Sequence, residues 1–269
     1  YNHRIMSETP SPKTRLGVVK FLNARPLIEG LDKPRLSLHF DVPSALADML
    51  TAGRVDAALV PVVDLARAGD AWEQISDAGI GCDGRTLTVQ VFSRVPPERM
   101  TRLHLDPDSH TSAVLAQLIW KLWYRRPLAV EPLDDATPLD RCESVLVIGD
   151  KVVTTPAGAF EHSVDLGSAW KQWTGLPFVF AVWAAPAGRP DNRRLGDTLS
   201  RARDLGVSRA TELARRHGPP LGWPVELARQ YMTHFMRYTV TTAALKGMAR
   251  FVALARHEGF VRPQETVPS

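Results

Sequence analysis

The sequence contains few cysteines and no long apolar run. Cys82 and Cys142 are the two cysteines among 269 residues, and neither belongs to a CxxC pair or has a histidine at metal-ligand spacing. This excludes a disulfide framework and favours free thiols in a reducing compartment. No segment reaches the ~18 consecutive apolar residues of a membrane helix. Residues 1–15 lack the apolar segment of a secretory signal. We therefore expect no membrane partner.

Several catalytic signatures are also missing. The sequence contains no GxSxG, no P-loop, no GxGxxG after the first expected strand and no HExxH. Any catalysis must then depend on positioning and hydrogen bonds rather than on a strong nucleophile, a metal or a nucleotide. We expect no cofactor and no metal.

The charge balance is close to neutral. Charged residues make up 23% of the chain and the net charge is +4, which is too small a surplus to indicate nucleic acid binding without a clustered basic stripe. A small anionic molecule fits this balance better, so we expect a small-molecule partner and no nucleic acid.

Apolar residues make up 44% of the chain, enough for one large or two ordinary domains. The first half alternates strand and helix patterns, which favours a largely parallel sheet. The expected strands are 15–21, 36–41, 56–60, 86–94, 103–105, 129–132, 144–149 and 178–185. The expected helices are 43–52, 61–67, 109–124 and 164–175, with three or four more after residue 191.

Two features predict two lobes. Pro96-Pro97 is a stiff connector after the strand expected at 86–94, and the apolar run Phe178–Ala185 reads as a doubly buried strand that leads the chain back. We expect one lobe from 14–95 plus 183–269, a second lobe from 96–182, and C-terminal helices packed on the first. This α/β organisation resembles the type II periplasmic-binding-protein fold, with a ligand cleft between the lobes.

In such sheets, ligands bind beyond the carboxyl ends of strands. That rule selects a few positions along the chain: Asn23, Pro61, 88–93, 106–112, Gly149-Asp150 and Trp173-Thr174. Of Trp170 and Trp173, we expect one in the cleft and one in the core.

The segment DPDSHTS, 106–112, connects a strand to a helix. Asp108 or Ser109 can cap the helix, and Thr111 and Ser112 add hydroxyls beside free N–H groups, an arrangement suited to a carboxylate. An ordinary helix cap is the alternative. His104 and His110, with two aspartates between them, fall on a strand end and a turn, which disfavours a metal site; His110 could also be a general acid or base.

Asn23 follows a buried strand in FLNARPL, where its amide offers donors and an acceptor but no strong base. The alternative is an asparagine that closes a tight turn before Pro26. Lys20 and Arg25 are nearby cations that could neutralise an anion. Gly149 and Asp150 end another apolar strand, where a structural turn is the favoured interpretation.

Six blocks in order, from about residue 16 to 185, together resemble the chorismate dehydratase family of the futalosine route to menaquinone. The blocks are LGVVKFLNARPL, DAALVPVVDL, GIGCDG followed by TVQVFS, LDPDSHTS, LVIGDK and DLGSAWKQWTGLPFVFAVW. The resemblance implies a cytoplasmic enzyme that removes water from chorismate to give 3-[(1-carboxyvinyl)oxy]benzoate. We expect it to be a monomer or a homodimer.

The resemblance also implies roles for particular residues. The family's asparagine matches Asn23, and a hydroxyl position that is usually serine matches Thr88; we expect both to be catalytic. The helix-start hydroxyls match Ser109, Thr111 and Ser112. We expect these three to bind substrate together with four further residues, namely His110, Gly149, Asp150 and Thr174. His110 stands where the family's SRTS form has arginine.

Two other classes compete with this interpretation. One is the binding-protein-like enzyme of the same pathway that makes 1,4-dihydroxy-6-naphthoate, which would need a well-placed base. The other is a solute-binding protein for a small carboxylate. A transcriptional effector-binding domain ranks last, because no helix-turn-helix segment accompanies it.

Overall fold

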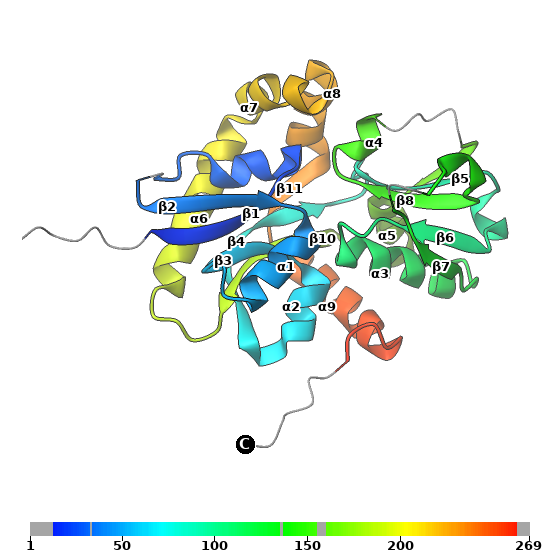
Figure 1. Cartoon of the computed structure of the whole chain (residues 1–269), viewed down its shortest axis with the longest axis horizontal. Coiled ribbons are helices and arrows are strands. Elements are labelled where there is room, and N and C mark those ends of the chain that lie inside the picture. Colours follow the sequence, from blue (N-terminus) through cyan, green and yellow to red (C-terminus); the bar gives the residue numbers. More distant parts are fainter. Residues whose placement is uncertain (1–12, 33, 135–136, 155–159, 263–269) are drawn as a thin grey trace, which may run out of the picture.

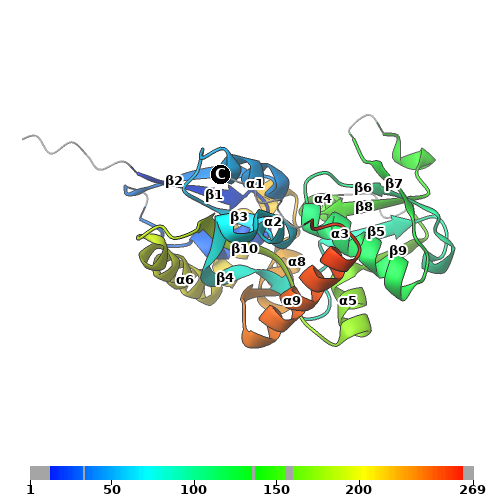
Figure 2. The same cartoon turned by 90° about the horizontal axis from the view of Figure 1, so that it is seen from below.

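The computed structural model describes residues 13–262 apart from 33, 135–136 and 155–159. The described chain forms two α/β lobes side by side, each built around its own sheet. Helices cover the faces of both sheets, and α9 (Thr242–His257) lies beneath them, reaching from the first lobe towards the second (Figures 1 and 2). The predicted two-lobed α/β fold is confirmed.

The first lobe contains a six-stranded sheet in the order β11-β4-β10-β3-β1-β2. Its strands are β1 (Thr14–Val19), β2 (Leu36–Asp41), β3 (Ala57–Pro61), β4 (Trp72–Cys82), β10 (Phe178–Pro186) and β11 (Met236–Thr239). Strands β1, β2 and β3 pair in parallel, whereas β10 runs antiparallel to both β3 and β4. The returning strand expected from Phe178 is therefore the centre of this sheet.

The second lobe contains a five-stranded sheet in the order β7-β6-β8-β5-β9. Its strands are β5 (Val89–Ser93), β6 (Arg102–Leu105), β7 (Ala129–Pro132), β8 (Ser144–Ile148) and β9 (His162–Asp165). Its helices are α3 (His110–Leu118), which continues as a π turn (Ile119–Trp123), α4 (Lys151–Thr154) and α5 (Leu166–Thr174).

The remaining helices belong to the first lobe. They are η1 (Leu22–Ile28), α1 (Pro43–Thr51), α2 (Val62–Ala68), α6 (Asn192–Ser208), α7 (Ala210–His217), α8 (Val225–Gln230), which continues as a π turn (Tyr231–Phe235), and α9. The C-terminal helices pack on the first lobe as expected, α6 against β4 and η1, and α9 against β10.

The lobe boundaries differ from those expected. Strand β5 precedes Pro96-Pro97 but already pairs with β8 and β9, so the chain crosses between Cys82 and Val89 rather than at the prolines. The return crossing precedes Phe178, where β10 enters the first sheet. Apolar runs identify buried strands but do not indicate which sheet a strand joins, because both sheets bury the same kind of side chain.

Aromatic packing joins the lobes at the return crossing. Trp170 on α5 is fully buried and packs edge-on against Phe178 and Phe251, while its indole N–H donates to the Pro177 carbonyl at 3.1 Å.

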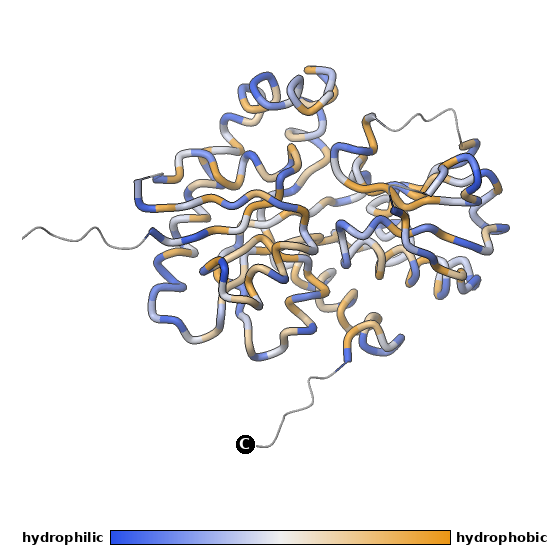
Figure 3. Tube along the Cα trace, viewed as in Figure 1, coloured by the Kyte–Doolittle hydropathy of each residue, from blue (hydrophilic) through white to orange (hydrophobic). Residues whose placement is uncertain are grey.

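Figure 3 shows the apolar residues gathered along the strands of both lobes and the polar ones along the outer helices and loops. No helix in the described ranges has the length and hydropathy needed to cross a bilayer.

Helix α6 approaches the sheet closely at one glycine. A Cβ atom built on Gly196 would lie 1.7 Å from the carbonyl oxygen of Ile75 in β4. Farther along α6, the buried Arg203 guanidinium pairs with Asp77 at 3.1 Å and fixes the helix in place. The helix therefore cannot move away freely to accommodate a larger side chain.

We expect Gly196→Ala to lower the thermal unfolding midpoint, although alanine favours an isolated helix by about 1 kcal/mol over glycine. The clash with the strand backbone outweighs that gain. Arg193→Ala, at an exposed position of the same helix, should change the midpoint little. An unchanged midpoint for Gly196→Ala in calorimetry would show that α6 lies farther from β4.

Candidate active site

A cavity of about 40 Å³ lies between the two lobes. Both sheets and the first crossing contribute to its walls. The lining residues are Val19, Phe21, Asn23, Pro43, Ile80, Thr86, Thr88, Val89, Ser109, Ser112, Ile148, Gly149, Phe180, Ala181 and Met236. Four of the residues proposed from the sequence as polar contacts therefore meet here: Asn23, Thr88, Ser109 and Ser112.

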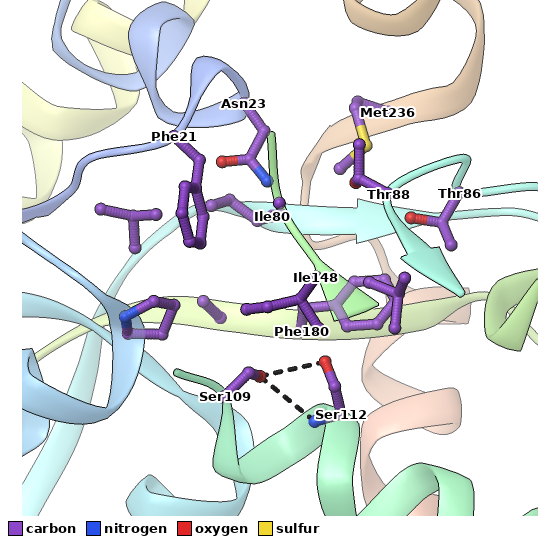
Figure 4. Close-up of a pocket in the computed structure, with 15 residues that line it drawn as sticks. Phe21, Asn23, Ile80, Thr86, Thr88, Ser109, Ser112, Ile148, Phe180 and Met236 are labelled. Atoms are coloured by element: carbon purple, nitrogen blue, oxygen red, sulfur yellow. Dashed lines mark hydrogen bonds between the residues drawn. The ribbon is translucent and has the colours of Figure 1, made fainter. Parts of the chain in front are cut away.

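The first turn of α3 forms one wall. The Ser109 hydroxyl accepts a hydrogen bond from the Ser112 backbone N–H at 3.2 Å and donates to the Ser112 hydroxyl at 3.0 Å (Figure 4). Of the two caps that the sequence allows, Asp108 and Ser109, the structure forms the one at Ser109, and both serines also line the cavity. The helix cap and the cavity wall thus share the same residues, and the positive end of the helix dipole lies at this wall.

Asn23 lies on the opposite side, in the first turn of η1 directly after β1. Its side chain is 8% exposed, and its Oδ1 has no hydrogen-bond partner among the described residues. A buried amide oxygen without a partner loses its hydration without compensation. This oxygen is therefore free to accept a hydrogen bond from a bound molecule.

Phe21 and Gly149 close the wall beside Asn23. Gly149 has φ +65°, and a Cβ there would lie 2.8 Å from the Phe21 ring. Glycine is needed because the backbone is left-handed and the ring lies directly against it. The sequence prediction that Gly149 permits close approach is consistent with this contact, although the approaching group is a protein side chain from the other lobe.

The crossing between β4 and β5 forms the third wall. The Thr88 hydroxyl lies 2.7 Å from the Tyr231 hydroxyl, and both side chains are buried. Burial raises the pKa of Tyr231 well above its ordinary value, against the opposing hydrogen bond from Thr88. Tyr231 therefore remains a protonated phenol that can hold the Thr88 hydroxyl in one orientation.

The cavity wall is largely apolar, with a few neutral polar side chains and no charge. Within the part of the chain that the structure describes, none of the lining residues is an acid, a lysine, an arginine or a histidine. The polar groups at the wall are hydroxyls, one amide and the backbone. Such a site can bind and orient an anion through neutral donors, and it can stabilise charge that develops during a reaction.

Asp150 acts beside the cavity as a contact between the lobes. Its carboxylate, at the end of β8, accepts from the Leu22 backbone N–H at 3.2 Å and from the Trp223 indole N–H at 2.9 Å. Burial raises the pKa of Asp150, while these two bonds and the Arg25 charge oppose the rise. Asp150 is not among the residues that line the cavity and instead joins the lobes, so its expected contact with substrate stays a prediction.

His110 and Thr111 also join the lobes rather than line the cavity. His110 Nδ1 lies 2.8 Å from Asp64 Oδ2 on α2, and the Thr111 hydroxyl accepts from the Val63 N–H at 3.2 Å. Successive residues on a helix point in different directions, so only part of the SHTS motif can face the cavity. Neither His110 nor Thr111 lines the cavity, so their expected contacts with substrate stay predictions.

Thr174 and the tryptophans lie outside the lining as well. The Thr174 hydroxyl donates to the Trp170 carbonyl and accepts from the Leu176 N–H, which completes the end of α5. Trp170 belongs to the core, and Trp173 packs edge-on against it. Neither ring lines the cavity, so the expected cleft tryptophan is wrong. A position near the end of a strand is expected at the edge of the sheet. Here Thr174 is the last residue of α5, and its hydroxyl completes the end of that helix instead.

The sequence reasoning missed several lining residues, among them Phe21, Thr86, Phe180 and Met236. It also missed Tyr231, which reaches Thr88 from the C-terminal π turn. Thr86 was detectable as a second hydroxyl two positions before Thr88. Tyr231 has no such signal, because its contact spans most of the chain.

The fold and the cavity define a binding-protein-like class, and known structures agree. The Archaeoglobus fulgidus protein of known structure superimposes with a TM-score of 0.71 at 14% identity, over 94% of this chain and 100% of that one. The periplasmic aliphatic sulphonate binding protein of Escherichia coli superimposes with a TM-score of 0.63 at 14% identity, over 94% of this chain and 95% of that one. The protein therefore has the periplasmic-binding-protein fold.

Sequence comparison identifies the family. A family described as menaquinone biosynthesis matches residues 14–257, so the chain belongs to that family. Among curated relatives, the chorismate dehydratase of Thermus thermophilus is 27% identical over 88% of this chain and 93% of its own length. That of Campylobacter jejuni is 29% identical over 86% of this chain and 89% of its own length.

We expect Asp150→Ala to loosen the contact between the lobes. The change leaves the Leu22 and Trp223 N–H groups without their acceptor, at a cost of about 1–3 kcal/mol for each group that stays buried. The thermal midpoint should fall, and the radius of gyration from small-angle scattering should rise as the lobes separate. Asp191→Ala, at an exposed position, is the control. A compact variant with an unchanged midpoint would show that other contacts close the cavity.

Proposed function

We propose that this protein dehydrates chorismate to 3-[(1-carboxyvinyl)oxy]benzoate. The observation that carries the proposal is the cavity, which unites Asn23, Thr88, Ser109 and Ser112 from both lobes without a charged wall residue. Membership of a menaquinone-biosynthesis family supports it, as does similarity to proteins named chorismate dehydratase.

The reaction is an elimination that makes the ring aromatic. The C3–H bond breaks and its electron pair forms the C3–C4 double bond, while the C4–O bond breaks and the hydroxyl leaves as water. Aromatisation supplies much of the driving force, so the enzyme has to align groups and stabilise charge rather than provide a strong base. We propose that the substrate's own enolpyruvyl carboxylate, tethered near C3–H, accepts that proton and passes it to the departing C4 hydroxyl, so that water leaves and the carboxylate is regenerated.

Each of these polar side chains at the cavity wall has a role in the proposed reaction. Chorismate with both carboxylates ionised has one hydrogen-bond donor, its C4 hydroxyl, and the unpartnered Asn23 Oδ1 is a matching acceptor. The Thr88 hydroxyl, held by Tyr231, donates to the departing oxygen. Ser109 and Ser112, at the positive end of α3, hold a carboxylate. Asn23 is neutral at working pH, so it positions the substrate and carries no proton.

The competing enzyme class, which makes 1,4-dihydroxy-6-naphthoate, has less support from this site. Carbon–carbon chemistry that forms a naphthoate needs a well-placed base, and none of the described lining residues is titratable in the ordinary range. His110 was the candidate for that role, but its ring pairs with Asp64 on the neighbouring lobe. The other alternative is a solute-binding protein, and measurements of turnover distinguish it from an enzyme. The proposal also includes a cytoplasmic location and a monomer or homodimer.

The direct test incubates the purified protein with chorismate and follows the loss of diene absorbance, with chromatography to identify the product. We expect steady conversion to 3-[(1-carboxyvinyl)oxy]benzoate and water. Binding of chorismate without conversion would favour the solute-binding alternative. Formation of a different product would place the protein in another reaction class.

The role of Asn23 predicts two different phenotypes. Asn23→Ala should lower kcat by about 100-fold with a smaller change in KM, because alignment matters most in the transition state. Asn23→Asp should damage both, since it sets a negative charge against an anionic substrate. Steady-state kinetics of both variants give the comparison. Equal kcat values for wild type and Asn23→Ala would remove Asn23 from the mechanism.

His110→Ala should retain substantial turnover, because His110 lies outside the cavity lining and the proposed proton acceptor is the substrate. We expect a lower thermal midpoint from the lost contact with Asp64 and a kcat within about tenfold of wild type. Near-complete loss of turnover with substrate still bound would identify His110 as the base and refute the substrate-assisted scheme.

A further inference from the structure

Thr86 places a hydroxyl in the cavity that the folded protein does not use. The residue is 1% exposed, and its Oγ1 has no hydrogen-bond partner among the residues described. Figure 4 shows this oxygen on the side of Thr86 that faces the other lining residues, beside Thr88. The neighbouring Thr88 hydroxyl differs, because it is bonded to Tyr231. A buried hydroxyl without a partner is unfavourable to folding unless a ligand satisfies it.

The backbone around Thr86 is held firmly by one carboxylate. Asp165 accepts from the Thr86 N–H at 3.0 Å, from the Leu87 N–H at 2.7 Å and from the Gln90 side-chain amide at 2.7 Å. Leu87 has φ +68°, a left-handed conformation that is rare for a leucine. Strained backbone persists where the surroundings impose it, and it concentrates at functional sites. The backbone position of Thr86 is therefore imposed by its surroundings.

We propose that Thr86 is a substrate-contacting residue whose hydroxyl donates a hydrogen bond to a carboxylate oxygen of the bound molecule. The inference rests on the proposed function and adds to it a binding residue on the crossing between the lobes. Thr88 and Thr86 then have separate tasks: Thr88 acts at the leaving oxygen with Tyr231, and Thr86 holds a carboxylate.

The chemistry of the cavity favours a carboxylate as the acceptor. Chorismate carries two carboxylates, and the described lining offers no cation to neutralise either of them. Ser109 and Ser112 can receive one carboxylate at the end of α3, and Figure 4 places them across the cavity from Thr86. The second carboxylate then needs a donor on the other side. A hydroxyl bonded to an anion gives a stronger hydrogen bond than one bonded to a neutral group.

The test compares Thr86→Val, which has nearly the same shape without the hydroxyl, with Thr86→Ser, which keeps it. The product retains both carboxylates and lacks the C4 hydroxyl, so its affinity measured by calorimetry reports on carboxylate binding alone. We expect Thr86→Val to weaken product binding and raise KM for chorismate by about tenfold or more. Thr86→Ser should restore both to within about threefold of wild type.

Thermal stability gives a second measurement, and its expected result differs from that for a hydroxyl with only a structural role. Because the Thr86 hydroxyl lacks a protein partner, Thr86→Val should leave the thermal midpoint of the ligand-free protein unchanged or higher. Thr174→Val is the matched control: its hydroxyl makes two hydrogen bonds within the fold and lies outside the cavity lining. That variant should lower the midpoint and keep wild-type product affinity and KM.

Wild-type product affinity and KM in Thr86→Val would overturn the proposal, as would a lowered midpoint that Thr86→Ser restores without a change in binding. The proposed reaction fails separately, if the wild-type protein does not convert chorismate. In that event the variants are compared for binding of chorismate itself, and the same tenfold difference between valine and serine would still support a carboxylate contact at Thr86.

Discussion

The partly buried carboxylate of Asp150 connects the two lobes at the point on which the geometry of the cavity depends. It accepts from the Leu22 N–H, one residue before Asn23, and from the Trp223 indole, whose ring stacks on Tyr231 with centroids 4.8 Å apart. Tyr231 in turn bonds to Thr88. One acceptor on the second lobe thus helps to position Asn23 and, through Trp223 and Tyr231, Thr88. The raised pKa of Asp150 shows that burial of this charge is unfavourable, and the two hydrogen bonds oppose that effect.

A cavity without charges suits the proposed reaction for a physical reason. A lysine or arginine against the enolpyruvyl carboxylate would neutralise the group proposed to accept the proton and would lower its basicity. Neutral hydroxyls, an amide and a helix end can still bind the anion, because their dipoles are fixed in advance and need no reorganisation. The binding-protein fold provides such a site between two lobes, where closure also removes water. On this view, substrate binding and catalysis use the same small set of hydrogen bonds.

Some elements of the site were predictable because they depend on local chemistry. Ser109 caps α3 as its place between a strand and a helix indicates, and the apolar run from Phe178 forms the buried strand β10. Other elements were mispredicted where one local pattern allows two outcomes. β5 joins the second sheet rather than the first, and Thr174 completes a helix end rather than a cavity wall. Strands β4, β9 and β11 were missed, since their mixture of polar and apolar residues carries little periodic signal.

The sequence by itself determined the class of fold, the positions of most strands and helices, and the segments that supply Asn23, Thr88 and the start of α3. These follow from apolar periodicity, capping and motif resemblance, which act over short stretches of chain. The tertiary structure alone decided which side chains of those segments face the cavity. It separates Ser109 and Ser112 from His110 and Thr111, and it brings Tyr231 to Thr88 across 143 positions. Such contacts depend on how the two lobes close against each other, and no local pattern encodes that geometry.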